Sequence, residues 1–84
     1  MIPQTVAGVL YSRRGCHLCE QAEDLVAVLM PAVVIRDVDA EPATRMRYGD
    51  RVPVLEVDGA VVMEGRFDER ALAAWLAVRT TTRG

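Results

Sequence analysis

Lysine is absent from this sequence, and aromatic residues and cysteines are scarce. All ten basic residues are arginine, and twelve acidic residues give a net charge of −2. No basic patch for nucleic acid is therefore evident. With one Trp, one Phe and two Tyr, the 51% hydrophobic content comes mainly from Val, Leu and Ala, which predicts an aliphatic core. Eighty-four residues are enough for one small domain with one such core.

Long apolar segments are also lacking. Residues 1–30 contain neither a charged stretch followed by an uninterrupted apolar run nor a segment long enough to span a bilayer. We find no internal repeat, linker or second domain. We therefore expect a single domain over 1–84, located in the cytoplasm, monomeric, and binding neither membranes nor nucleic acid.

The two cysteines, Cys16 and Cys19, lie one helical turn apart. Disulfides are rare in the cytoplasm, and a CxxC closes a very short loop. The chain-entropy description assigns such a loop about 2 kcal/mol, against about 4.5 kcal/mol for a loop as long as this domain. A disulfide that only stabilises the fold is thus a poor explanation of the pair. Two thiols at this spacing can exchange electrons, although the same spacing also occurs in zinc sites.

Apolar periodicity predicts three helices and four strands, with the CxxC between the first strand and the first helix. A right-handed crossover through that helix makes the first two strands parallel. The later two strands flank Asp58-Gly59, a strong signal for a type I′ hairpin. The expected strands cover 6–11, 32–38, 52–57 and 60–63, and the expected helices cover 17–30, 39–48 and the segment after Asp68.

Local signals set the ends of the two later helices. Asp39 is expected to cap the short second helix, with Pro42 in its first turn and Gly49 at its end. Asp68 is expected to cap the third helix, where Phe67 and Leu72 occupy the two positions of a hydrophobic staple. The second helix carries the weakest periodic signal of the three.

The order βαβαββα with this CxxC resembles the thioredoxin-like fold, and more closely its glutaredoxin branch, over about residues 5–79. The sequence looks most similar to short bacterial glutaredoxin-like proteins with His-Leu between the cysteines. The resemblance implies an α/β fold: a four-stranded mixed sheet of order 2-1-3-4, with the first and third helices on one face and the second on the other. The residues that carry it are Tyr11-Ser12-Arg13, Cys16, Cys19, Val52-Pro53, Gly65 and Asp68.

The two thiols are expected to differ in reactivity. Cys16 begins a helix, so its sulfur faces unpaired N–H groups and the positive end of the helix dipole, with Arg13 and Arg14 nearby; these favour the thiolate and make Cys16 the nucleophile. Cys19 lacks those donors and is expected to resolve a mixed disulfide on Cys16. His17 can act as a cation or a general base, but its position fits better with a solvent-facing residue that modestly tunes the reduction potential of the dithiol.

The glutaredoxin resemblance also implies glutathione as a co-substrate, with no permanently bound cofactor. It places Tyr11 in the site and Arg13 where the family uses a Lys to hold a glutathione carboxylate. It implies a cis-proline at Pro53, which exposes Val52 to the substrate backbone. Its turn at Gly65 and Asp68 holds the γ-glutamyl end. A simpler interpretation has Arg13 in an exposed loop, Pro53 at a strand start and Asp68 as a helix cap.

Several residues depart from the family pattern. His17-Leu18 replaces Pro-Tyr between the cysteines, and Arg51 replaces a Thr before Val-Pro. Glu64 replaces a Gly of the glutathione turn and brings an unhelpful negative charge, which Arg66 is expected to offset. Phe67 stands where the family turn has an Asp, so one Gly and one Asp of the turn are replaced and glutathione binding is expected to be weak.

We therefore expect a thiol-disulfide oxidoreductase that reduces protein disulfides or glutathione mixed disulfides. The oxidised enzyme is expected to be reduced again by glutathione or a thioredoxin reductase system. Metal binding is the second hypothesis. Two Cys and one His give too few ligands for a closed zinc site in a monomer, so a zinc or iron-sulfur site would need a dimer. A binding module with incidental thiols is the third hypothesis.

Overall fold

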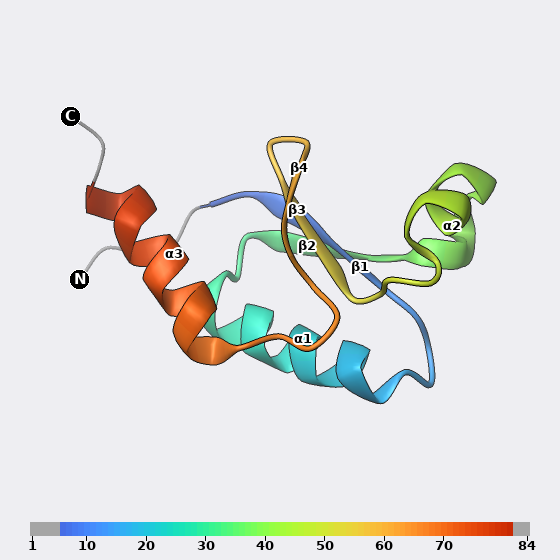
Figure 1. Cartoon of the computed structure of the whole chain (residues 1–84), viewed down its shortest axis with the longest axis horizontal. Coiled ribbons are helices and arrows are strands. Elements are labelled where there is room, and N and C mark those ends of the chain that lie inside the picture. Colours follow the sequence, from blue (N-terminus) through green and yellow to red (C-terminus); the bar gives the residue numbers. More distant parts are fainter. Residues whose placement is uncertain (1–5, 82–84) are drawn as a thin grey trace.

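The structure, a computed structural model, describes residues 6–81, with side chains to residue 79. Four strands and three α-helices follow one another in the order expected for βαβαββα (Figure 1). A 3₁₀ turn, η1, precedes the second helix. The elements are β1 (Gly8–Ser12), α1 (His17–Leu29), β2 (Val33–Asp37), η1 (Val38–Ala40), α2 (Pro42–Tyr48), β3 (Val54–Val57), β4 (Ala60–Glu64) and α3 (Glu69–Thr81).

The strands form one sheet in the order β2-β1-β3-β4. β1 runs parallel to β2 and antiparallel to β3, and β3 pairs antiparallel with β4. This is a thioredoxin-like α/β fold, and it confirms the expected strand order. The β3–β4 turn has positive φ at both Asp58 (54°) and Gly59 (79°), as a type I′ hairpin requires.

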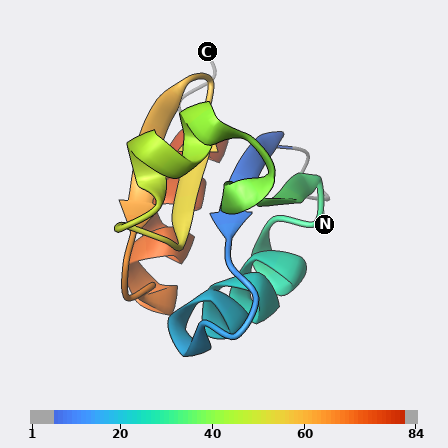
Figure 2. The same cartoon turned by 90° about the vertical axis from the view of Figure 1, so that its right-hand side faces the viewer.

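The main core lies between the sheet and the helices α1 and α3. Its buried residues are Leu10, Ala22, Val26, Met30, Leu55, Val57, Leu72 and Leu76. The opposite face carries a smaller cluster of Val38, Tyr48 and Val54 under α2. Figures 1 and 2 show α1 and α3 sharing one side of the sheet, with α2 apart from both. The expected distribution of helices over the two faces is confirmed.

The predicted cap of the second helix is wrong. Asp39 lies inside η1, and the Asp37 carboxylate caps that turn by accepting the Asp39 N–H at 2.9 Å. α2 begins at Pro42, preceded by Glu41, which makes no side-chain cap bond. Proline suits this position because it has no N–H that needs a partner there. The Asp39 carboxylate is instead engaged by Arg13.

The ends of α2 and α3 agree with the sequence signals. Gly49 ends α2, and a Cβ there would lie 2.4 Å from the Arg45 carbonyl oxygen, so the position needs glycine. Asp68 caps α3, since its carboxylate accepts the Arg70 N–H at 3.0 Å. Phe67 packs on the core cluster that includes Leu72, as the staple predicts. No helix within residues 6–81 is long and apolar enough to cross a membrane.

Candidate functional site: a dithiol at the start of α1

The loop between β1 and α1 places Cys16 as the first residue before the helix. Gly15 has φ of +78°, a left-handed conformation that favours glycine. The Cys16 N–H closes the turn by donating to the Arg13 carbonyl oxygen at 3.3 Å. Cys16 itself is extended, with φ of −99° and ψ of 114°, and serves as the N-cap of α1. Strand, turn and helix together fix where its thiol lies.

The Cys16 sulfur accepts a hydrogen bond from the backbone of the first helical turn. Its Sγ accepts the Cys19 backbone N–H at 3.2 Å. Side-chain oxygens of Ser, Thr, Asp or Asn commonly make this contact at helix N-termini. This bond holds the sulfur at the N-terminus of α1, where backbone N–H groups and the positive end of the helix dipole face it. Cys16 is half-buried and both thiols are free. The site therefore presents an accessible sulfur in surroundings that suit a nucleophile.

The Cys19 thiol is fully buried one helical turn further on. Burial raises its pKa above the ordinary value, and its hydrogen bond with the Cys16 side chain adds to this increase. Hydrogen bonds with the Arg13 backbone and the Ser12 side chain act in the opposite direction without reversing it. Cys19 is thus a protonated thiol held against Cys16.

Arg13 is hydrogen-bonded to η1 and to the end of α2. Its Nε and Nη2 donate to the two carboxylate oxygens of Asp39, each at 2.8 Å, and its Nη1 donates to the Gly49 carbonyl oxygen at 2.9 Å. Hydrogen bonding to Arg13 lowers the pKa of Asp39. This guanidinium ties the CxxC loop to η1 and to the end of α2. The position that the family resemblance assigns to a glutathione carboxylate is occupied by a carboxylate of the chain itself.

The proline loop and the turn after β4 lie side by side. The Val52–Pro53 peptide bond is cis, and the Pro53 carbonyl oxygen accepts the Gly65 N–H at 2.9 Å. Gly65 has φ of +73°, so glycine is suited to this turn as well. The structure thereby joins two of the segments that the resemblance assigns to substrate binding.

The two departures from the family pattern near this turn compensate each other. Arg51 donates to one Glu64 carboxylate oxygen from Nε at 2.9 Å and from Nη2 at 2.5 Å. The expectation that Arg66 offsets Glu64 is therefore corrected: Arg51 is the paired residue. The Arg51 guanidinium also lies over the Tyr48 ring, 5.3 Å from its centroid.

Comparison with known proteins agrees with this arrangement. The family described as Glutaredoxin-like domain (DUF836) matches residues 9–77. The chain belongs to this glutaredoxin-like family. A structural-genomics target protein from X. campestris, XcR50, is 37% identical, with a TM-score of 0.73 over 84% of this chain and 96% of that one. A mutant thioredoxin from Halobacterium salinarum NRC-1 is 32% identical, with a TM-score of 0.68 over 96% and 80% of the two chains. None of the curated proteins compared matches the chain.

The other predicted site residues of the glutaredoxin-like domain lie in different surroundings. His17 is exposed, with its Nε2 3.3 Å from Gln21 Nε2 on the next helical turn. Arg14 is exposed and lines a pocket beneath the loop. Tyr11 packs on the second cluster, with its ring centroid 5.3 Å from that of Tyr48. No group of three or more His, Cys, Asp or Glu suited to a metal occurs in the part of the chain that the structure describes.

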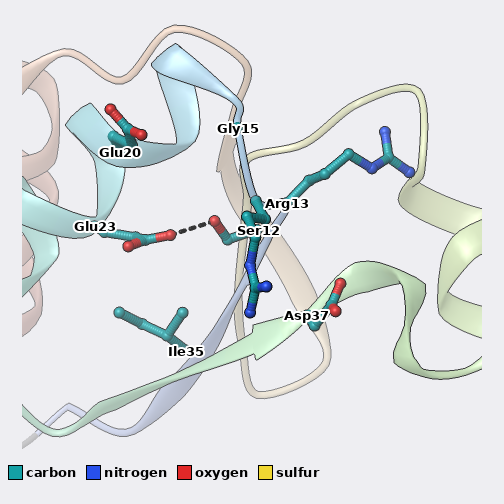
Figure 3. Close-up of a pocket in the computed structure, with 8 residues that line it drawn as sticks. Ser12, Arg13, Gly15, Glu20, Glu23, Ile35 and Asp37 are labelled. Atoms are coloured by element: carbon teal, nitrogen blue, oxygen red, sulfur yellow. Dashed lines mark hydrogen bonds between the residues drawn. The ribbon is translucent and has the colours of Figure 1, made fainter.

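Sequence reasoning missed two polar residues behind the dithiol. Ser12 is buried at the end of β1, and its hydroxyl donates to the Glu23 carboxylate of α1 (Figure 3). Both line a pocket of about 300 Å³ that opens beside the CxxC loop. A signal for Glu23 exists in the sequence, because it follows Cys19 by four residues and so shares its helix face. Ser12 gives a weaker signal, as one polar residue at the end of an apolar strand.

Proposed function

We propose that this glutaredoxin-like domain is a thiol-disulfide oxidoreductase that reduces protein disulfides or glutathione mixed disulfides. One observation carries the proposal: a half-buried sulfur at a helix N-terminus accepts the N–H of a second, buried cysteine one turn away. The first sulfur suits attack on a disulfide, and the second suits the intramolecular step that follows. The family membership supports a redox role.

The reaction has two exchange steps. The Cys16 thiolate attacks one sulfur of the substrate disulfide, the substrate S–S bond breaks, and the first substrate thiolate leaves. Cys19 then loses its proton and attacks the Cys16 sulfur of the mixed disulfide. A Cys16–Cys19 bond forms, the second substrate thiolate leaves, and solvent protonates both leaving groups. The substrate gains the electron pair that the two cysteines lose.

Glutathione is the proposed co-substrate that reduces the Cys16–Cys19 disulfide back to the dithiol. Its glycyl carboxylate would pair with Arg13, its cysteinyl peptide with Val52 beside Pro53, and its α-amino group with Asp68 near Gly65, with Tyr11 behind the loop. Because Arg13 already holds Asp39, the tripeptide must compete with an intramolecular carboxylate. We expect affinity no better than millimolar, or about −4 kcal/mol. The proposed partners are thus a disulfide substrate and a reductant, with the domain acting as a monomer.

A paired turnover assay tests the function and the donor together. Reduction of a protein disulfide is followed with either glutathione and its reductase, or thioredoxin reductase, supplying electrons from NADPH. We expect turnover with at least one system, its complete loss in Cys16→Ser, and trapped mixed disulfides in Cys19→Ser. No turnover with either system contradicts the proposal. A visible absorption band in protein made under iron-replete conditions would support the cluster-binding alternative instead.

A further inference from the structure

Arg51 and Glu64 form an exposed ion pair at the end of the sheet from which the CxxC loop leaves. Tyr11 of β1 is paired with Val54 of β3, and Val54 is paired in turn with Glu64 of β4. Neighbouring strands lie about 4.8 Å apart, so the Glu64 backbone is about 10 Å from that of Tyr11, close to where β1 ends. Because the Arg51 and Glu64 side chains are 45% and 42% exposed, both charges are accessible to a molecule that binds at this end of the sheet.

The ion pair also bridges two segments that a backbone hydrogen bond already joins. Arg51 immediately precedes the cis Val52–Pro53 peptide, and Glu64 immediately precedes Gly65. The Pro53 carbonyl oxygen accepts the Gly65 N–H at 2.9 Å. In the function proposed above, these two segments contact the substrate. A positive charge on one segment and a negative charge on the other therefore lie beside the position of a bound disulfide.

The position of Arg51 depends on Tyr48 as well as on Glu64. The Arg51 backbone N–H donates to the Tyr48 carbonyl oxygen at 2.8 Å, and its guanidinium lies 5.3 Å from the Tyr48 ring centroid. Two guanidinium nitrogens donate to one Glu64 oxygen. A carboxylate of a substrate would have to replace Glu64 on these donors and would remain close to its negative charge. A neutral or cationic substrate meets neither cost, so the pair disfavours one class of substrate.

We propose that Glu64, by neutralising Arg51, makes this site select against anionic disulfides. The favoured substrates are protein disulfides whose neighbouring residues are neutral or basic, in preference to disulfides that carry carboxylates, such as those of glutathione. Arg51 and Glu64 are specificity-determining residues, because they act on the choice of substrate and not on the exchange of sulfur bonds. Arg13 of the CxxC loop is likewise bound to a carboxylate of the chain itself, that of Asp39. The inference rests on the proposed dithiol function and selects among its substrates.

Three small disulfides of similar length separate charge from reactivity. At neutral pH hydroxyethyl disulfide is neutral, cystamine is cationic and dithiodipropionate is anionic. The reduced protein is reacted with each in about 0.1 M salt, where the Debye length is about 10 Å. Each rate constant is divided by that of mercaptoethanol, a small neutral thiol, with the same disulfide. A wild type no faster than Cys16→Ser with hydroxyethyl disulfide would contradict the proposed function, whereas the ratios among the three disulfides test the charge selection alone.

Glu64→Gln keeps the size of the side chain and removes its charge, while Tyr48 still holds Arg51. We expect the rate with dithiodipropionate, relative to hydroxyethyl disulfide, to rise by about two- to fivefold, the range of a solvent-exposed ion pair. Arg51→Gln leaves the Glu64 charge unpaired, so the preference should move by a similar factor toward cystamine. In the double variant, the gain with the anionic disulfide should disappear.

Asp58→Asn is the matched control, because it removes one negative charge from another exposed ion pair, that with Arg79. Asn tolerates the positive φ at this turn position. The five residues of β4 separate Asp58 from Glu64 by about 17 Å, more than the Debye length of about 10 Å, so its ratios should stay within about 1.5-fold of the wild type. Unchanged ratios in Glu64→Gln, or an equal shift in Asp58→Asn, would overturn the proposal.

Discussion

At the scale of single residues, the site depends on a contrast between two thiols of the same type. Cys16 is half-buried and accepts a backbone N–H, whereas Cys19 is fully buried and its pKa is raised. Only Cys16 is therefore both partly exposed and placed at the helix N-terminus. The contrast comes from position alone: one sulfur lies before the first helical turn and the other within it.

Alkylation measures this contrast directly. With iodoacetamide at neutral pH, peptide mapping should show Cys16 labelled first. In Cys16→Ser, labelling of Cys19 should be slow at neutral pH and increase as pH rises, because a thiol with a raised pKa is protonated until more alkaline conditions. Preferential labelling of Cys19 in the wild type would reverse the assignment of nucleophile and resolving thiol.

Arg13 is the second residue whose environment decides its role. We expect Asp39→Asn to release the guanidinium and to tighten glutathione binding by about two- to fivefold, the range of a solvent-exposed ion pair. Titration followed by amide chemical shifts near Val52 and Asp68 gives the affinity. Arg13→Ala combined with Asp39→Asn is the control, and the gain should vanish there. Tighter binding that persists without Arg13 would exclude Arg13 as the carboxylate anchor.

The Arg13–Asp39 pair also has a defined pH dependence. Because the pKa of Asp39 is lowered in the folded state, its contribution to stability is fully present above the unfolded value of about 3.9 and is lost as pH falls through the lower folded value. The difference in denaturation midpoint between wild type and Asp39→Asn should therefore shrink under acidic conditions. A difference that grows with acidity would contradict the pairing.

At the scale of elements, the connection from the end of β1 to α1 places a cysteine thiol at the start of a helix. Gly15 makes this possible because the loop needs a positive φ at this position. A Cβ there would meet no described atom within 4 Å, so the requirement for glycine is conformational and not steric. The turn after β4 likewise contacts the proline loop through the Gly65 N–H. Two glycine turns thus bring separate segments of the chain to the site.

Gly15→Ala tests the first of these turns. We expect a loss of about 1–2 kcal/mol in the free energy of unfolding, since the cost is that of a left-handed conformation and not of a steric clash. Urea denaturation measures it, with Arg14→Ala in the same loop as the control for side-chain loss. An unfolding free energy equal to that of the wild type would show that the loop adopts another conformation.

The local elements were predictable because their signals lie within a few residues of one another. The CxxC between strand and helix, the Asp58-Gly59 turn and the Asp68 cap are all read from adjacent positions, and all three are present. The cap assigned to Asp39 failed for a tertiary reason, since its partner Arg13 lies 26 residues away. Glu41, which precedes α2, makes no side-chain cap bond, so Pro42 is the one start signal that this helix carries in the sequence.

At the scale of the whole molecule, the sheet order and the sides of the helices followed from the crossover rule and the family resemblance. The missed interactions share one property: each joins side chains from two different segments of the chain. Ser12 and Glu23 are 11 residues apart, and Arg51 and Glu64 are 13 apart. Periodicity can place Glu23 on the helix face of Cys19, but it does not show which residue of another element pairs with a given side chain. The position of the cysteine pair between strand and helix was readable from sequence, but the side-chain contacts around it were not.

Reaction of the reduced wild-type protein with one equivalent of a small disulfide peptide tests the central claim most directly. The products are separated by mass, and the protein is mapped without reduction. The account predicts that both substrate thiols are released and that Cys16 and Cys19 are recovered in one disulfide-linked peptide. A stable adduct on either cysteine, a disulfide between two chains, or no reaction would contradict a paired dithiol mechanism.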